Sequence, residues 1–198
     1  MVCLACRAWS ARYVCEGCSR RLRPAADRLV DGRIVRAAFE HSGPARVLVH
    51  RLKYEGIRSA GRVLGGAMAG QVRVPVDAVT YVPRVHLRRW RYGIDQSLEL
   101  ARVVAAELGL PVVAALHPGW WSPANAGARA ADRQTPIFTV PAKELGGGFV
   151  SLVVVDDVLT TGSTLAHAAG TLQANFPIIV QSVVATSASE VTSLRSRR

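Results

Sequence analysis

Long apolar runs are absent from this 198-residue sequence. No stretch approaches the roughly 18 to 20 consecutive apolar residues that a membrane-spanning helix requires. The opening residues, MVCLACRAWSAR, lack the basic and then apolar order of a secretory signal. A hydrophobic fraction of 49% with 20% charged residues is typical of a folded, soluble chain. We therefore expect a cytoplasmic protein without a transmembrane segment.

Lysine is nearly absent. Of the 25 basic residues, 23 are arginine, and the two lysines are Lys53 and Lys143. The formal net charge is +11, and residues 1–60 alone carry 12 basic against 5 acidic residues. Arginine is favoured where a planar fork grips phosphate, so this balance indicates a nucleic acid or another polyphosphate as partner. A GC-rich genome would explain the total charge equally well, but it explains the local clustering less well.

Cysteine is missing after residue 18, and the four cysteines form two pairs, CLAC and CEGC. Thiolates in two such pairs can converge on one tetrahedral Zn²⁺. Disulfides are the alternative, but a cytosolic chain disfavours them and pairing within each motif would cross-link almost nothing. We predict a structural zinc ion, which would lower the effective net charge to about +9. The predicted ligands are Cys3, Cys6, Cys15 and Cys18.

Arginines and aromatic residues lie among these cysteines and directly after them. Basic side chains contact nucleic-acid backbones, and aromatic rings stack on unpaired bases. For Trp9 and Tyr13 we slightly favour a second interpretation, in which they form the small core of the cysteine module. The arginines predict contacts with single-stranded nucleic acid, and they are Arg7, Arg12, Arg20, Arg21 and Arg23.

Beyond residue 25 the chain alternates strand and helix patterns, which predicts an α/β fold with a mostly parallel sheet flanked by helices. Ser42 and Asp95 are candidate helix caps, and Gly109 is a candidate helix end. We expect a cysteine module over 1–24, a larger domain over 25–188 and a disordered basic tail over 189–198. Strands are expected over 33–41, 77–83, 111–116, 149–157 and 178–185, helices over 44–55, 58–71, 96–109 and 163–175, and a loop over 117–135.

The stretch LVVVDDVLTTGST, residues 152–164, carries the strongest chemical signal. Its four leading apolar residues predict a strand buried on both faces, which places Asp156 and Asp157 at the carboxyl edge of the sheet, where α/β folds bind ligands. The hydroxyls around Gly162 precede a helix, whose free N–H groups favour an anion. Two carboxylates beside such an anion site suit a sugar phosphate, because the acids can accept hydrogen bonds from the sugar hydroxyls while the turn binds the phosphate. Direct Mg²⁺ binding by the two acids is the alternative, and it leaves the hydroxyls unused.

LVVVDDVLTTGST matches the phosphoribosyl-pyrophosphate (PRPP) signature of type I phosphoribosyltransferases at nearly every position. From Cys3 to about Ala185 the chain resembles the ComF family of competence-associated phosphoribosyltransferase-like proteins, which join an N-terminal four-cysteine zinc finger to such a domain. LVHRLKYEG (48–56) looks like the family's LKYxG segment, and YVPRVHLRRWRYGIDQSLELA (81–101) resembles its stretch VPVPL…R…RGFNQ…LA. The resemblance implies a type I phosphoribosyltransferase fold and binding of PRPP with Mg²⁺.

By this resemblance, Asp156 and Asp157 are the catalytic pair and contact the ribose hydroxyls. Pro83, Arg84 and Lys53 would lie near the pyrophosphate. A flexible basic loop with Arg88, Arg89, Arg91 and Gln96 would close over it. For the arginines from Arg84 to Arg91, contact with nucleic acid is the alternative to contact with pyrophosphate. The residues that would hold the 5-phosphate are Thr160, Thr161, Gly162, Ser163 and Thr164, and Val158 and Leu159 before them would also belong to the PRPP-binding segment.

The chain departs from the family where the acceptor would bind. Tyr92 replaces an arginine of the family, Asn125 replaces a glutamine, and an Arg-x-x-Asn motif after Arg133 is missing. Binding of PRPP is therefore the firmer expectation, and transfer to a base is the weaker one. Three functions remain open: an accessory of DNA uptake or processing with single-stranded DNA and competence proteins as partners, a metabolic phosphoribosyltransferase, and a non-catalytic PRPP sensor.

Overall fold

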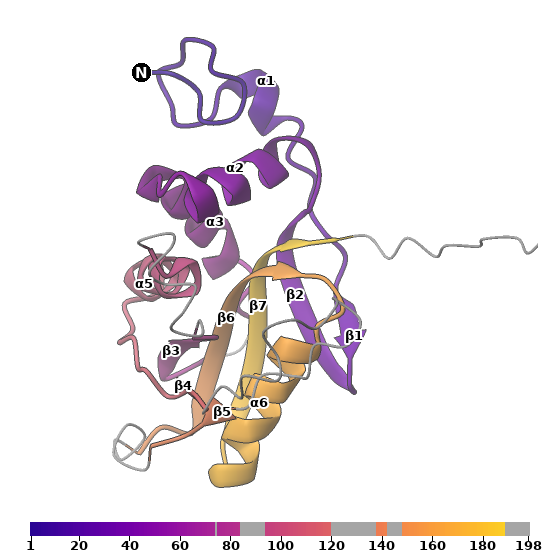
Figure 1. Ribbon diagram of the computed structural model, residues 1–198, viewed down its shortest axis with the longest axis vertical. Coiled ribbons are helices and arrows are strands. Elements are labelled where there is room, and N and C mark those ends of the chain that lie inside the picture. The colour runs from indigo at the N-terminus through magenta and orange to yellow at the C-terminus, as the bar shows by residue number, and fades with distance from the viewer. Residues whose placement is uncertain (74, 84–93, 120–137, 142–147, 189–198) are drawn as a thin grey trace, which may run out of the picture.

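A five-stranded sheet forms the centre of the protein (Figure 1). The computed structural model describes residues 1–73, 75–83, 94–119, 138–141 and 148–188. The strand order is β1-β2-β7-β6-β3, and only the β1–β2 pair is antiparallel. This confirms the mostly parallel sheet that the sequence predicts. The strands are β1 (Arg28–Val30), β2 (Arg33–Glu40), β3 (Ala78–Tyr81), β6 (Ser151–Leu159) and β7 (Ile179–Ser187).

Helices cover both faces of this sheet (Figure 1). One face packs against α2 (Gly43–Tyr54), α3 (Arg58–Ala69) and α5 (Gln96–Leu108). The other packs against α6 (Ser163–Asn175) and the short pair β4 (His117–Pro118) and β5 (Phe138–Thr139). Among the described residues, no helix is both long and apolar enough to cross a membrane.

Strand β6 is buried on both faces, as its unbroken apolar run predicts. Val153 and Val155 point into the core beneath α2, α3 and α5, whereas Leu152 and Val154 point into the core beneath α6. All four side chains are 0% exposed. The two acids that follow therefore come at the carboxyl end of a rigid central strand.

Local capping signals define α5. The Asp95 carboxylate accepts a hydrogen bond from the backbone N of Leu98 at 3.2 Å, and Gly109 ends the helix with a φ of +67°. Both roles are those predicted from the sequence. Ser42 also precedes α2 as predicted, although its side chain makes no capping hydrogen bond.

Of the predicted strand over 111–116, the structure keeps one parallel bridge, between Val112 and Val79 of β3. The Val79 N–H donates to the Pro111 carbonyl and the Val113 N–H donates to the Val79 carbonyl, both at 2.9 Å, and Ala115 and Leu116 are buried in the core beneath α6. Pro111 has no N–H to donate to a ladder, which limits pairing at the start of this segment. The predicted loop over 117–135 begins instead with β4, and its residues 120–135 lie outside the described part of the chain.

The cysteine-rich N-terminus, residues 1–24, packs beside α2 and α3 (Figure 1). Leu4 is buried in the same core as the side chains of these helices, and Arg62 of α3 donates a hydrogen bond to the Tyr13 hydroxyl at 3.3 Å. The chain then enters the sheet through a bridge between Pro24 and Phe39. The short helix α1 (Glu16–Ser19) lies within this N-terminal part.

Candidate functional site

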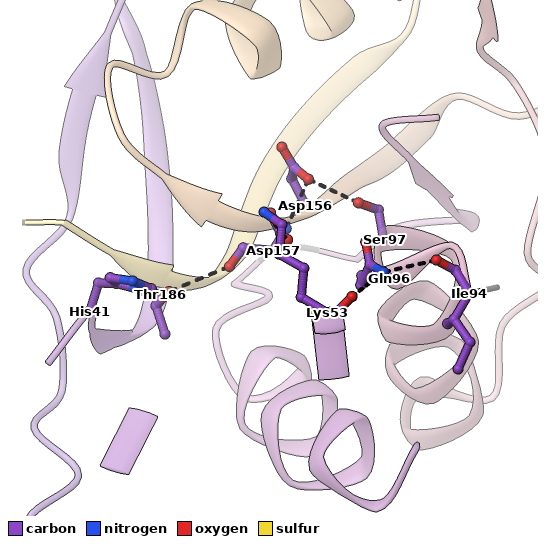
Figure 2. A network of polar contacts seen from close by, with 8 residues as sticks. All are labelled: His41, Lys53, Ile94, Gln96, Ser97, Asp156, Asp157 and Thr186. Carbon is purple, nitrogen blue, oxygen red and sulfur yellow. Dashed lines mark hydrogen bonds and ion pairs between the residues drawn. The ribbon is translucent and has the colours of Figure 1, made fainter. Parts of the chain in front are cut away.

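Asp156 and Asp157, called the acid pair below, lie near the carboxyl end of β6 at the centre of a polar network (Figure 2). The partners come from α2, α5 and β7, so four separate elements meet at this edge of the sheet. In parallel α/β sheets this edge is where ligands bind.

Asp157 forms an ion pair with Lys53, the residue of α2 that the sequence predicts near the site. The Lys53 Nζ lies 3.2 Å from the Asp157 Oδ2, and the two side chains are 29% and 13% exposed. Partial burial shields this pair from solvent, so it interacts more strongly than an ion pair on the open surface. The structure thus brings together two residues that are more than a hundred positions apart in the sequence.

Asp156 receives neutral hydrogen-bond donors. The Ser97 hydroxyl donates to the Asp156 Oδ1 at 2.9 Å, and the backbone N of Asp157 donates to the same oxygen at 2.8 Å. Burial, followed by the charge of Asp157, raises the pKa of Asp156 from its ordinary value of 3.8 to about 7. The two adjacent acids therefore differ in their partners, and Asp156 takes up a proton near neutral pH.

Thr186 of β7, together with His41, supports the backbone of the acid pair. The Thr186 hydroxyl donates to the backbone carbonyl of Asp157 at 3.5 Å, and the His41 Nδ1 lies 2.8 Å from that hydroxyl (Figure 2). Burial, helped by the positive charge of Arg46, lowers the pKa of His41. A neutral His41 that donates from Nδ1 to the Thr186 oxygen satisfies both groups.

The segment Thr160–Thr164, called the hydroxyl turn below, links β6 to α6. Gly162 has a φ of +84° and is the N-cap residue of α6. The exposed Thr161 and Ser163 hydroxyl oxygens lie 3.2 Å apart at the start of this helix. Exposed hydroxyls and helix N-terminal N–H groups form the kind of surface that binds phosphate.

Strand β1 packs behind the hydroxyl turn. A Cβ at Gly162 would lie 2.7 Å from the Val30 Cγ1, so glycine is required there for space as well as for its positive φ. The Arg28 guanidinium donates to the backbone carbonyl of Thr160 at 2.8 Å. The shape of the turn thus depends on an edge strand that is distant in sequence.

Two predicted site residues have different surroundings from those expected. Gln96 was expected in a flexible basic loop, but it lies in the first turn of α5 and is 0% exposed. The Leu159 side chain is 1% exposed and belongs to the core, because the strand continues two residues beyond the acids. Pro83 lies two residues after the end of β3, and Val158 is partly buried. Other predicted residues lie outside the described part of the chain: Arg84, Arg88, Arg89, Arg91, Tyr92, Asn125 and Arg133.

Four residues of the network were missed by reasoning from the sequence, namely Ser97, His41, Thr186 and Arg28. Ser97 lies within the family-like segment 81–101, directly after Gln96, and this neighbourhood was its only signal. The other three lie in strands or strand ends where nothing in the local pattern marks a polar partner.

The four cysteines converge into one cluster near the N-terminus, as their spacing predicts. Their Sγ atoms all lie within 4.8 Å of one another, and those of Cys6 and Cys15 are 3.7 Å apart. Zinc–sulfur bonds of about 2.3 Å in a tetrahedron place the sulfurs about 3.8 Å apart. The cluster can therefore hold a metal ion, and its geometry is consistent with a structural zinc site.

The protein surrounds this cluster with polar contacts that favour a thiolate at one position. Burial acts to raise the pKa of the Cys3 thiol, but hydrogen bonds from backbone N–H groups, chiefly that of Cys15, outweigh it and lower this pKa to about 6. Burial and hydrogen bonds with the other thiols raise the pKa of Cys18 to about 12. A bound cation would favour deprotonation of all four thiols.

The exposure of Trp9 contradicts the prediction that it forms the core of the cysteine module. Trp9 is 86% exposed and Tyr13 is 38% exposed, so Trp9 does not form the core of the module. Leu4 fills that role instead, because it reaches the helices of the larger domain. Arg20 forms an ion pair with Glu16. The arginines predicted to contact nucleic acid are all exposed: Arg7, Arg12, Arg20, Arg21 and Arg23.

No protein-family model matches the chain. Competence protein F of Haemophilus influenzae is 27% identical over 172 residues, which cover 78% of this chain and 71% of that protein.

Solved structures with a similar fold include two enzymes. Glutamine PRPP amidotransferase from B. subtilis, complexed with ADP and GMP, is 22% identical, with a TM-score of 0.48 over 69% of this chain. The match spans only 30% of that enzyme. Orotate phosphoribosyltransferase from Aeropyrum pernix is 21% identical, with a TM-score of 0.37 over 84% of this chain and 75% of the enzyme.

A mostly parallel sheet with helices on both faces, with two acids and a hydroxyl turn at its carboxyl edge, agrees with the phosphoribosyltransferase-like α/β fold class that the sequence predicts. Its N-terminal cysteine cluster and its 27% identity to Competence protein F over most of both chains support the resemblance to the ComF family.

Proposed function

We propose that this protein binds PRPP with Mg²⁺ at the acid pair and the hydroxyl turn, and single-stranded DNA through its cysteine module. The proposed role is in DNA uptake or processing, in the cytoplasm and together with competence or DNA-processing proteins. One observation carries the PRPP assignment: two acids and the hydroxyl-bearing start of a helix lie in sequence at the ligand-binding edge of the sheet.

The ribose of PRPP suits the acid pair. Its 2- and 3-hydroxyls are donors, and carboxylate oxygens accept hydrogen bonds more strongly than neutral acceptors do. The 5-phosphate suits the hydroxyl turn, where Thr161 and Ser163 present hydroxyls and α6 presents its N-terminal backbone amides. Both groups of one sugar phosphate thus find complementary chemistry along a short segment.

The pyrophosphate group needs cations, and Lys53 is the described candidate nearest to the acid pair. Bound Mg²⁺ would supply charge compensation for the pyrophosphate, with the oxygens of PRPP itself as suitable hard ligands. If the protein transfers the phosphoribosyl group, the acid pair would hold the ribose while C1 loses pyrophosphate.

The cysteine module suits single-stranded DNA because exposed guanidinium groups and an exposed indole lie on one small unit. Arginines contact phosphates without reading sequence, and an aromatic face stacks on any base. A structural zinc ion at the cysteine cluster would hold this unit in shape.

Calorimetric titration with PRPP and Mg²⁺ tests the proposal. In the Asp156→Asn/Asp157→Asn variant, the loss of charge-assisted hydrogen bonds of about 1.5–3 kcal/mol each should weaken binding at least about tenfold. Asp27→Asn is the matched control, because its side chain is 53% exposed and lies in the linker before β1. Equal affinity of the double variant and the control would contradict the proposed site.

A second assay separates the enzymatic alternatives. Wild-type protein with bound PRPP is supplied with a panel of nucleobases, and pyrophosphate release is measured. Release with one base would identify a transferase and its acceptor. Binding without release would favour PRPP as a regulatory or structural ligand of a DNA-handling protein.

A further inference from the structure

We propose that the first turn of α5 is a positioning element for the acid pair: Ser97 holds Asp156, while Gln96 holds Lys53 and, through it, Asp157. This proposal rests on the proposed role of the acid pair as the ribose site. It assigns functions to two buried residues that lie outside the acid-pair and hydroxyl-turn segment.

Gln96 has a defined orientation in the core. It is 0% exposed, and its Nε2 donates to the carbonyl of Ile94 at 2.8 Å and to the carbonyl of Lys53 at 3.4 Å. Because both neighbours are carbonyls, the amide nitrogen must face them, and the buried Oε1 has no partner among the residues that the structure describes. An apolar side chain of similar size would avoid that unpaired oxygen. The two donated hydrogen bonds are therefore what the amide contributes.

The contact to Lys53 restrains the end of α2. Lys53 is the penultimate residue of this helix, where the last carbonyls lack partners within the helix. Gln96 supplies a donor to one of them from a different helix, which restrains the backbone from which the Lys53 side chain extends (Figure 2). The Lys53 ammonium then lies 3.2 Å from Asp157. Gln96 thus acts on Asp157 indirectly, through the position of Lys53.

Ser97 acts on the other acid directly. It is 3% exposed, and its hydroxyl donates to the Asp156 Oδ1. The groups around Asp156 include the like charge of Asp157 next to it, the Lys53 ammonium from α2 and the Ser97 hydroxyl from α5. His41 lies behind Asp157, beyond Thr186. A hydrogen bond to the carboxylate form favours ionisation, so Ser97 opposes the effects of burial and of Asp157 on the pKa of Asp156.

Titration of the free protein tests the Ser97 contact. Protein with ¹³C-labelled aspartate carboxyl groups is titrated by NMR, and the Asp156 signal is identified by its loss in Asp156→Asn. Ser97→Ala should raise the Asp156 midpoint by about half a pH unit or more, and Ser97→Thr, which keeps the hydroxyl, should restore it. Ser151→Ala removes a buried hydroxyl at the other end of β6, which has no hydrogen-bond partner in the described part of the chain, and should leave the midpoint unchanged. An unchanged midpoint in Ser97→Ala would overturn this part of the proposal.

A double-mutant cycle tests the Gln96 contact. Gln96→Met keeps the side-chain volume and removes the donors, and it should weaken PRPP binding about fivefold to tenfold. In a Lys53→Met background the same change should have little further effect, because the residue that Gln96 positions is already lost. Gln181→Met, at a buried glutamine near the start of β7, is the matched control and should not change the affinity.

The outcomes separate this proposal from the proposed function. If wild-type protein does not bind PRPP, the proposed function fails, while the carboxyl titration still decides whether Ser97 tunes Asp156. If PRPP binds but Gln96→Met behaves like Gln181→Met, or adds fully to Lys53→Met, the positioning role of Gln96 is wrong. A Gln96→Met protein that does not fold leaves the Ser97 titration to decide on the positioning element.

Discussion

The cysteine module and the acid-pair site are built in opposite ways. The module's proposed ligands, Cys3 to Cys18, come from one short segment that contains little buried apolar surface. The acid-pair site gathers residues between His41 and Thr186, and large cores on both faces of the sheet hold their elements in place. The module should therefore depend on a metal ion for its shape, whereas the acid-pair site should depend on the packing of the domain.

Removal of the metal from the cysteine module should have the largest effect and should be local. Structural zinc sites contribute apparent binding free energies of about 10–16 kcal/mol, which are linked to folding. Wild-type protein should hold about one zinc ion per chain by elemental analysis, and Cys15→Ser should lose it.

Amide hydrogen exchange separates the two regions in that variant. Protection should fall in the N-terminal module and persist in β6 and β7. Purified protein that contains no metal and two disulfides would contradict the zinc assignment. Loss of protection throughout the sheet would show that the two regions are not independent.

Gly162→Ala should have the next largest effect, at the acid-pair end of the sheet. The positive φ and the close approach of Val30 together should cost about 2 kcal/mol or more in denaturant-induced unfolding, and PRPP binding should weaken as the hydroxyl turn shifts. Gly170→Ala on the same helix is the control. A Cβ there meets no atom of the described residues within 4 Å, so this variant should be as stable as wild type or more stable. Equal stability of the two variants would contradict the support of the turn by β1.

Asp156→Asn should raise thermal stability in a pH-dependent manner. The folded protein binds a proton at Asp156 up to a pH of about 7, whereas the unfolded chain releases it near 3.8. Wild-type stability therefore falls as the pH rises through this interval, and Asn removes that loss.

The gain in Tm should grow from pH 4 to pH 7 and reach at least about 2–4 °C at pH 8. Calorimetric scans of wild type, Asp156→Asn and the exposed control Asp27→Asn measure it. A gain that is equal at pH 4 and pH 8 would show that burial does not disfavour the Asp156 carboxylate.

DNA binding should map to the module and leave the acid-pair site unaffected. Arg12→Glu and Arg21→Glu should each reduce the salt slope of single-stranded DNA binding by about 1 or more, whereas Arg102→Glu, on an exposed part of α5, should not. Trp9→Ala should weaken binding by about 1–3 kcal/mol. Fluorescence anisotropy at several salt concentrations measures both effects, and PRPP affinity should not change. If Arg102→Glu reduced the salt slope as much as Arg12→Glu and Arg21→Glu do, the DNA contacts would not be confined to the cysteine module.

The same contrast explains what the sequence could predict. The cysteine cluster and the N-cap of α5 depend on residues close together in the chain, so their spacing alone indicates them. The strand before Asp156 was also predictable, because four consecutive apolar residues suit only a doubly buried position. Ser97, Thr186 and His41 reach the acid pair through tertiary packing, which leaves no periodic signal in their own segments. Trp9 was misjudged because the module buries Leu4 against the larger domain instead of forming its own aromatic core.

A crystal structure of the protein with PRPP and Mg²⁺ tests the central claim most directly. We predict that the ribose hydroxyls will contact the carboxylates of Asp156 and Asp157, and that the 5-phosphate will lie against Thr161, Ser163 and the first amides of α6. Lys53 should remain at the acid pair or move toward the pyrophosphate. Density for PRPP away from β6, or a ribose that faces neither acid, would contradict the assignment of this edge of the sheet as the ribose-phosphate site.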